Sequence, residues 1–247
     1  MKTMKKLLIG IFALITVFNL ASCEELENLV GSDETAAALK EALKISTDTS
    51  VAQTSKTNGY FGNAAIKIIF PEEAENIQKI LQLPGVSTVG QPLLDGLELK
   101  MNQAAEKAAP VAKDIFISAI TNLTITDALN ILNGDQDAAT QYLRANANTQ
   151  LYDAFYPEVE KAMTTVGADV AWNQVTTQYN TYSSNPIIVQ TAAIAGLSFG
   201  PVDTDISAYT TNKALDGLFH VIAEEEVKIR SDISHRVTEL LQRVFGQ

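Results

Sequence analysis

The stretch QPLLDGLELKMNQAAEKAAPVAKDIFISAIT, residues 91–121, decides the fold class of this chain. Its apolar residues recur at alternating steps of three and four, the spacing that lines one face of an α-helix. They are Leu94, Leu97, Met101, Ala104, Ala108, Val111 and Ile115. Leu99 and Ile117 fall on the opposite side, so we expect a central helix that is buried on two faces. Pro110 predicts a kink or a split, because proline cannot donate the helical hydrogen bond.

The segments before this tract also read as helical. A helix is expected from a cap at Ser32 or Asp33 to about Ser55, and Thr57-Asn58-Gly59 should end it. An apolar patch follows, consisting of Tyr60, Phe61, Ile66, Ile68, Ile69 and Phe70. Pro71 and the two glutamates after it are typical of a first helical turn, and this helix should stop near Pro84-Gly85.

Shorter helices are expected after residue 121. Their boundaries are predicted at Thr126-Asp127, Gly134-Asp135, Pro157, Asn185-Pro186 and Gly200-Pro201. Two apolar stripes close the chain, separated by a cap at Ser231-Asp232. The first consists of Leu215, Leu218, Phe219, Ile222 and Ile229, and the second of Ile233, Val237, Leu240, Leu241, Val244 and Phe245.

No sustained strand alternation, internal repeat or linker rich in Gly, Ser or Pro is present in the sequence. Hydrophobic residues make up 46% of the 247 residues, enough for a substantial core. We therefore predict an all-α fold, with residues 33–247 forming a single compact multi-helix domain of about eight to ten helices.

The first residues have the character of an export signal. Three lysines lie within residues 1–6, and the apolar run LLIGIFALITVF covers residues 7–18. Twelve helical residues rise about 1.5 Å each, which is too short for a hydrocarbon core of roughly 30 Å. A basic start followed by a short apolar run predicts a cleaved signal peptide over residues 1–22.

Leu20-Ala21-Ser22-Cys23 closes this segment, and Cys23 is the only cysteine of the chain. LASC resembles the lipobox of bacterial lipoproteins, in which the cysteine is acylated and becomes the new N-terminus. The alternative is an ordinary signal peptide with a cysteine of no consequence. We expect lipidation at Cys23, with residues 23–32 as the lipidated N-terminus and a short tether. The anchor implies a membrane partner and a place in the bacterial cell envelope, on the outer membrane facing the periplasm.

Composition excludes several classes of function. The formal net charge of -11 argues against binding nucleic acid, whose phosphates it repels. One cysteine excludes an intrachain disulfide framework and a multi-cysteine metal site. His220 and His235, the only histidines, lie off their apolar stripes and should be solvated. We therefore expect no metal and no cofactor, and no nucleophile motif is present.

Two glutamates raise the question of buried charge. Glu226 falls among the apolar positions of its helix, and Arg230 lies one turn further on, where an ion pair can form. A carboxylate there needs a partner, and a structural pair and an acid-lined pocket are both compatible with the sequence. Glu106 lies opposite the seam of the 91–121 helix and is solvated if that helix is peripheral. If the helix is central, Arg144, Lys213 or Arg230 could be its partner.

Three stretches carry a resemblance to a bacterial lipoprotein family, domain of unknown function 4197. One is Asn58-Gly59-Tyr60 with Ala65–Ile68. Another is Met101–Pro110, continuing through Thr126–Ala128 and Ile131–Gly134 to Asp137–Tyr142. The third is Tyr209–Phe245 with its closing Gly246, and it includes Lys213–Phe219, Glu225-Glu226 and Ile229-Arg230. Residues 163–202 match least well.

The resemblance implies an all-helical, exported and lipid-anchored domain without an established activity. It also draws attention to eight residues as an interior polar cluster, either structural or ligand-binding. They are Glu106, Asp127, Thr140, Tyr142, Tyr209, Lys213, Glu226 and Arg230.

Two functions remain open from the sequence. The first is a non-enzymatic envelope lipoprotein whose helical body binds an envelope protein or serves structurally. The second is a small-ligand binder or hydrolase that uses an acidic interhelical pocket near Glu106 and Glu226.

Overall fold

The computed structural model describes residues 21–200, 202 and 204–245, and within these residues the chain is helical, without any β-strand. The predicted all-α fold in a single domain is confirmed. The α-helices are α2 (Ala21–Thr54), α3 (Glu75–Leu81), α4 (Ser87–Ala108), α5 (Ala112–Thr121), α6 (Ile125–Leu132), α7 (Ala138–Val166), α8 (Ala168–Ser183), α9 (Pro186–Ile194), α10 (Ile206–Ser231) and α11 (Glu239–Phe245). Three 3₁₀ helices join them, η1 (Glu72–Ala74), η2 (Ala109–Val111) and η3 (Ile233–His235). Of the segment predicted as a signal peptide, residues 1–20 lie outside the described residues.

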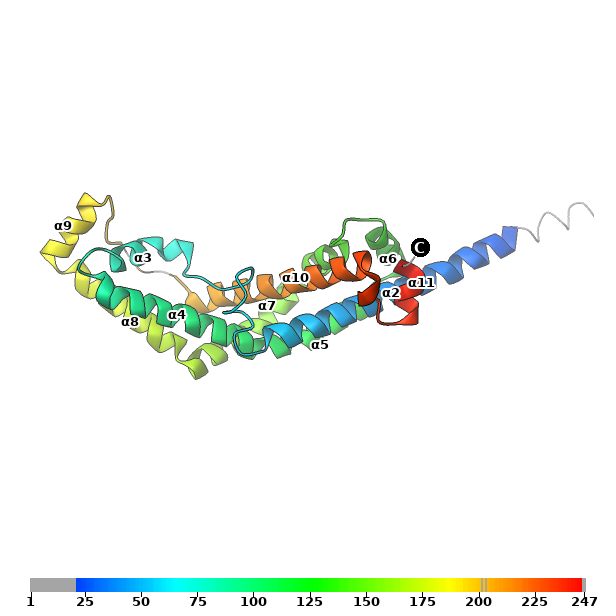
Figure 1. Cartoon of the computed structure of the whole chain (residues 1–247), viewed down its shortest axis with the longest axis horizontal. Helices are drawn as coiled ribbons and strands as arrows, with labels where there is room; N and C mark the ends of the chain where they lie inside the picture. Colours follow the sequence, from blue (N-terminus) through cyan, green and yellow to red (C-terminus); the bar gives the residue numbers. More distant parts are fainter. Residues whose placement is uncertain (1–20, 201, 203, 246–247) are drawn as a thin grey trace, which may run out of the picture.

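The helices run mostly along one long axis, with α7 extending from one half of the molecule to the other (Figure 1). Helix α7 packs against α4, α5, α8 and α10, and α2 packs against α5, α6, α10 and α11. Helices α3, α8 and α9 form one end of the molecule, and α6, α11 and the start of α2 lie at the other (Figure 1). The core lies between these packed helices. It includes an edge-to-face contact of Phe116 with Phe219, whose ring centroids are 5.3 Å apart.

The tract at residues 91–121 is central, as predicted, because α4 contacts α7, α8 and α10. The apolar seam from Leu94 to Ala108 is buried. Pro110 lies in η2 and splits the tract into α4 and α5, which confirms the expected break. The 3₁₀ turn also shifts the register, so Val111 is 38% exposed and the buried face of α5 is Ala112, Phe116 and Ile120.

The apolar patch between α2 and α3 lies in a loop, residues 55–71, that packs on α10. Tyr60 is fully buried, and its hydroxyl donates a hydrogen bond to the Ala214 carbonyl oxygen at 2.7 Å. Burial raises the pKa of Tyr60, and the nearby Glu106 carboxylate raises it further. A Cβ at Gly217 would lie 2.6 Å from Cε1 of Tyr60 and 3.2 Å from Cβ of Ile66. The absence of a side chain at Gly217 therefore allows the loop to lie directly on α10.

Replacing Gly217 with alanine is expected to destabilise the protein by about 1–3 kcal/mol, because the fixed Tyr60 ring cannot move away from the added methyl group. Helix propensity alone would favour the change by about 1 kcal/mol. The sign of the change in the free energy of unfolding therefore distinguishes the steric clash from helix propensity. Gly96→Ala in α4, where an added Cβ meets nothing within 4 Å, is the matched control and should stabilise the protein. Urea unfolding measures both variants, and stabilisation by Gly217→Ala would contradict the steric argument.

The predicted helix boundary at Pro157 is wrong, because α7 continues through this residue. Phe155 and Val159 are buried on either side of it and hold the helix in place. Pro157 has no N–H to donate to the carbonyl oxygen of Asp153. Both residues lie on the exposed face of α7, where water can bind that oxygen.

The second apolar stripe predicted at the C-terminus, from Ile233 to Phe245, does not form one continuous helix, so this prediction is wrong. Asp232 ends α10 and caps η3, and Ile233 and Val237 are 70% and 66% exposed. Arg236 turns back and donates hydrogen bonds to the carbonyl oxygens of Ile229 at 3.0 Å and Arg230 at 2.9 Å. These bonds satisfy acceptors at the end of α10 and end the helix there.

Helix α2 begins at Ala21, about twelve residues before the predicted cap at Ser32 or Asp33. The predicted tether, residues 23–32, is therefore helical in this structure. Among the described side chains of α2, the first buried one is Ala36, and the helix before it projects beyond the rest of the molecule (Figure 1).

Candidate functional site

The eight residues of the predicted polar cluster form four separate sets of contacts. Thr140, Glu226 and Arg230 form one network, Asp127 and Tyr142 form a second contact, and Tyr209 and Lys213 form a third. Glu106 lies apart, against the loop at residues 55–71. The expectation of a single interior cluster is therefore wrong.

Glu226 on α10 accepts hydrogen bonds from the first turn of α7. Its carboxylate oxygens lie 3.1 Å from the Ala139 backbone nitrogen and 2.9 Å from that of Thr140, whose hydroxyl donates at 2.8 Å. The residue that precedes α7, Asp137, provides no side-chain cap of its own. Glu226 therefore caps α7 from another helix and places a negative charge at the positive end of its dipole.

Arg230 completes this network on the other side. Its Nε lies 3.0 Å from Oε1 of Glu226, and its other nitrogens donate to the carbonyl oxygens of Ile131 and Leu132 at the end of α6. The side chains of Arg230 and Glu226 are only 11% and 4% exposed. The predicted ion pair is thus present, and it fixes the turn between α6 and α7 onto α10.

Glu106 on α4 is buried, as expected for a central helix, but its predicted cationic partner is wrong. The carboxylate accepts backbone hydrogen bonds from Tyr60 at 3.2 Å and Phe61 at 3.4 Å. None of Arg144, Lys213 and Arg230 forms an ion pair with it in the described part of the chain. The loop at residues 55–71 supplies the donors, and helical periodicity could not reveal them.

Asn102, one turn before Glu106, holds the same loop and was not singled out from the sequence. Its side-chain amide donates to the Ile68 carbonyl oxygen at 2.7 Å and accepts from the Ile68 nitrogen at 2.9 Å. Asn102 is fully buried. The only signal in the sequence is an amide within an apolar helical tract, which indicates a buried partner without naming it.

Asp127 and Tyr142 meet at the start of α6, on the surface. Asp127 forms a capping box with Thr124, whose hydroxyl donates to its carboxylate at 2.7 Å, and the Tyr142 hydroxyl donates at 3.0 Å. The hydrogen bonds from Thr124 lower the pKa of Asp127, and that from Tyr142 lowers it further.

The carboxyl group of Asp127 is expected to titrate below its ordinary value of 3.8. Because the folded-state pKa is depressed, its contribution to stability is complete above that value and is lost as the pH falls through the folded pKa. Thr124→Val should return the pKa toward 3.8, whereas Thr124→Ser keeps the hydroxyl and should leave it low. Carbon-detected NMR titration measures it, and an equal pKa in all three proteins would count against the capping box as its cause.

Tyr209 and Lys213 lie on the exposed side of α10, at a groove. The Tyr209 hydroxyl donates to the Ile69 carbonyl oxygen at 3.1 Å, and the Lys213 ammonium lies 5.7 Å from the centre of the Tyr209 ring. Of the eight predicted residues, Thr140, Tyr209 and Lys213 line this groove, which has a volume of 490 Å³. Arg144 also lines it, paired with Asp216 at 2.6 Å and stacked over Phe219 at 4.5 Å.

No single helix among the described residues is long and apolar enough to cross a bilayer, although the bent pair Ser87–Thr121 and Ile125–Leu132 passes the test of length and composition. Within the same residues, no group of three His, Cys, Asp or Glu side chains is arranged to hold a metal ion. Both histidines are at least partly exposed, as predicted.

The fold and these contacts define an all-α domain in which buried carboxylates and a buried amide bind backbone groups. These bonds hold the turns and the central loop in place. The chain belongs to the family described as "Protein of unknown function (DUF4197)", whose match covers residues 30–246. The match confirms the family of unknown function that the sequence predicted, whereas the lipid anchor stays a prediction. Comparisons with curated proteins and with solved structures found no match.

Proposed function

We propose that this protein is a bacterial lipoprotein, acylated at Cys23, whose helical domain binds a partner protein in the cell envelope. The observation that carries the proposal is the sequence Leu20-Ala21-Ser22-Cys23, which follows a basic start and a short apolar run. The expected location is the outer membrane, with the domain facing the periplasm.

The position of Cys23 in the fold supports an anchor at this point. It lies two residues after the start of α2, in the part of that helix that projects from the molecule (Figure 1). From Cys23 to Ala36, the first buried side chain described on α2, a helix rises roughly 20 Å. An acylated Cys23 would therefore leave the folded domain free of the bilayer.

The buried acids favour a binding protein over a hydrolase. A general acid or base must reach the proton of a substrate. Glu226 is enclosed by Thr140 and Arg230, and Glu106 is engaged by the backbone of residues 60–61. The hollow that Glu106 borders is lined by Ser55, Thr57, Gln103, Lys107 and Val166 and does not reach Glu226. The two acids therefore contact different elements and do not form one acidic pocket.

Intact mass spectrometry of the membrane-extracted protein tests the anchor. We expect a chain that begins at Cys23 and carries added fatty acyl mass, together with label from an alkyne-tagged fatty acid. Cys23→Ser should abolish the label, whereas Ser22→Ala keeps a small residue before the cysteine and should retain it. A chain that still carries Met1, or an unmodified Cys23, would overturn the proposal.

Proximity labelling in the envelope tests the binding role. The full chain should label a specific set of proteins that a bare lipidated tag does not. Indistinguishable labelling patterns would refute a partner protein and leave the anchor standing.

A further inference from the structure

The groove beside Tyr209 is larger than its first hollow. A second hollow, of 480 Å³, adjoins it and shares Ile69, Tyr209, Lys213 and Asp216 with it. The two together form one continuous groove along α10, between the loop at residues 55–71 and the start of α7. Each hollow alone lies within the range of about 300–1,000 Å³ typical of drug-sized ligands. The lining residues along α10 run from Asp205 to Ala223, a helical rise of about 27 Å, which is long enough for an extended peptide of six residues.

The two halves of the groove differ in charge. The first half carries the basic side chains Lys67, Arg144 and Lys213 against two aspartates, although the whole chain has a net charge of -11. Lys67 is paired with Glu98 at 3.2 Å and Arg144 with Asp216 at 2.6 Å, so Lys213 supplies the positive charge that a ligand would meet. The second half is acidic and is lined by Glu72, Asp205 and Asp216. Its one basic residue is Lys213, at the junction of the halves. A ligand that fits both halves needs a negative group at one end and a positive group at the other.

Two of these charges, one in each half of the groove, are available to a ligand. The part of the chain that the structure describes provides no ion-pair partner for Lys213 or Glu72, and both are exposed. Arg144, by contrast, is held by Asp216 and Phe219. The exposed Asn212 also lines the second hollow, and its side-chain amide can both donate to and accept from a peptide backbone.

The walls of the groove are fixed before any ligand arrives. Tyr209 is bonded to the Ile69 carbonyl oxygen, and Tyr60 to that of Ala214, so the loop is attached to α10 at two points. Asn102 holds Ile68 from the other side. A rigid groove loses little conformational entropy when it binds a flexible chain.

We infer that this groove binds an extended peptide segment that carries an acidic and a basic side chain, the acidic one near Lys213 and Arg144 and the basic one near Glu72. The inference deepens the proposed function by naming the kind of partner, and it rests on the domain being a binding module. The acylation of Cys23 is not needed for it, so the two can fail separately.

An array of immobilised hexapeptides tests this inference with the purified full chain. Each peptide carries one glutamate and one lysine, in either order and with every spacing from one to four residues between them, and its matched partner has glutamine at both positions. We expect at least tenfold more protein on the best doubly charged peptide than on its matched partner. Raising the salt concentration should reduce this binding.

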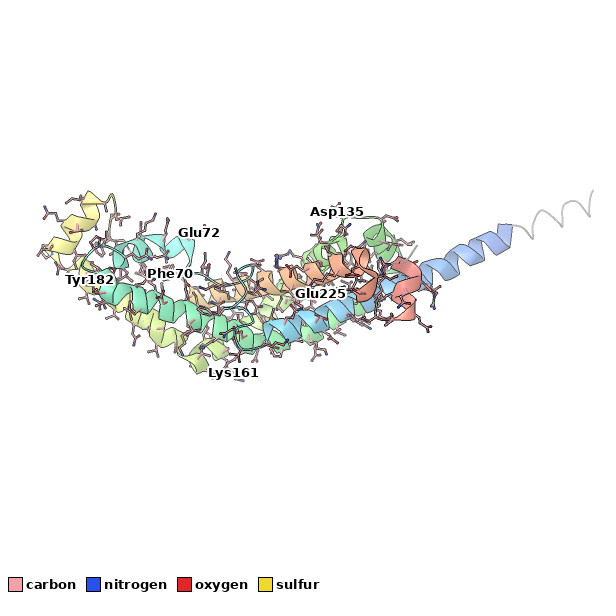
Figure 2. All side chains as sticks on the ribbon, in the orientation of Figure 1. Phe70, Glu72, Asp135, Lys161, Tyr182 and Glu225 are labelled. Carbon is pink, nitrogen blue, oxygen red and sulfur yellow. The ribbon has the colours of Figure 1, made fainter. Side chains whose placement is uncertain are left out.

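Variants locate the peptide on the surface. Lys213→Gln and Glu72→Gln should each weaken binding of the best peptide at least fivefold, as measured by fluorescence anisotropy. Lys161→Gln and Asp135→Asn make the same charge changes elsewhere and should change it less than twofold (Figure 2). Circular dichroism should show that all four variants are folded.

Three results would overturn the inference. One is an array without preference for doubly charged peptides. Another is a best peptide whose affinity is unchanged by Lys213→Gln and Glu72→Gln. The third is binding of the free dipeptide Glu-Lys as tight as that of the hexapeptide, which would make the groove a site for a small zwitterion.

Discussion

Replacing Glu226 with alanine is expected to lower the free energy of unfolding by about 3–5 kcal/mol, the largest effect of any single change considered. The change leaves the guanidinium of Arg230 buried without its counter-charge, which is the costly way to break a buried pair. It also leaves two backbone N–H groups at the start of α7, those of Ala139 and Thr140, without an acceptor. Urea unfolding followed by circular dichroism measures the loss.

Two further variants separate the causes. Glu226→Gln keeps one acceptor oxygen but not the charge, so its loss should be intermediate. Glu224→Ala removes a neighbouring carboxylate on the same helix, which forms an exposed ion pair with His220 at 3.3 Å. This change should alter stability by less than about 0.5 kcal/mol. Equal effects at positions 224 and 226 would refute a special role for the buried network.

Asn102→Ala is expected to cost about 2–4 kcal/mol, because it leaves both buried backbone groups of Ile68 without their partner. The loop at residues 55–71 should loosen as a result, and the amide proton of Ile68 should exchange with solvent much faster. Urea unfolding and hydrogen exchange measure the two effects.

Asn102→Asp and Asn146→Ala are the controls for this prediction. The aspartate keeps the shape and the acceptor but loses the donor and buries a charge, so it should cost at least as much as alanine. Asn146 also donates to a backbone carbonyl, that of Tyr142, but it is exposed, and its removal should cost less than about 0.5 kcal/mol. A small effect of both Asn102 variants would mean that the loop is held by its apolar side chains alone.

Apolar periodicity predicted the part of the fold that depends on neighbours along one helix. The seam from Leu94 to Ala108 and the stripe from Leu215 to Ile229 are buried as expected, because helical spacing alone decides which side chains share a face. Pro110 and Pro157 could not be told apart in this way. Whether a proline breaks a helix depends on what packs around it, and that packing involves residues distant in sequence.

Among the polar contacts, too, those within one helix were predictable and those between distant segments were not. The contact between Glu226 and Arg230 lies within one helix and was predictable from its spacing of four. The partners of Glu106 and Asn102 lie in a loop, and the second role of Glu226, as a cap for α7, depends on how α10 crosses that helix. The groove was not predictable either, because its residues come from three segments that only the fold brings together.

The projecting start of α2 has an electrostatic consequence. Charge repulsion in physiological salt decays over a Debye length of about 8 Å, whereas roughly 20 Å of helix separates Cys23 from the first buried side chain. An acidic protein held at this distance from anionic headgroups meets a largely screened surface potential. The full chain has a net charge of -11, and without residues 1–22, which hold three lysines and no acidic residue, the charge is -11 − 3 = -14. If Cys23 is acylated as proposed, the length of this helix would allow so acidic a domain to be tethered close to a negatively charged surface without being driven from it.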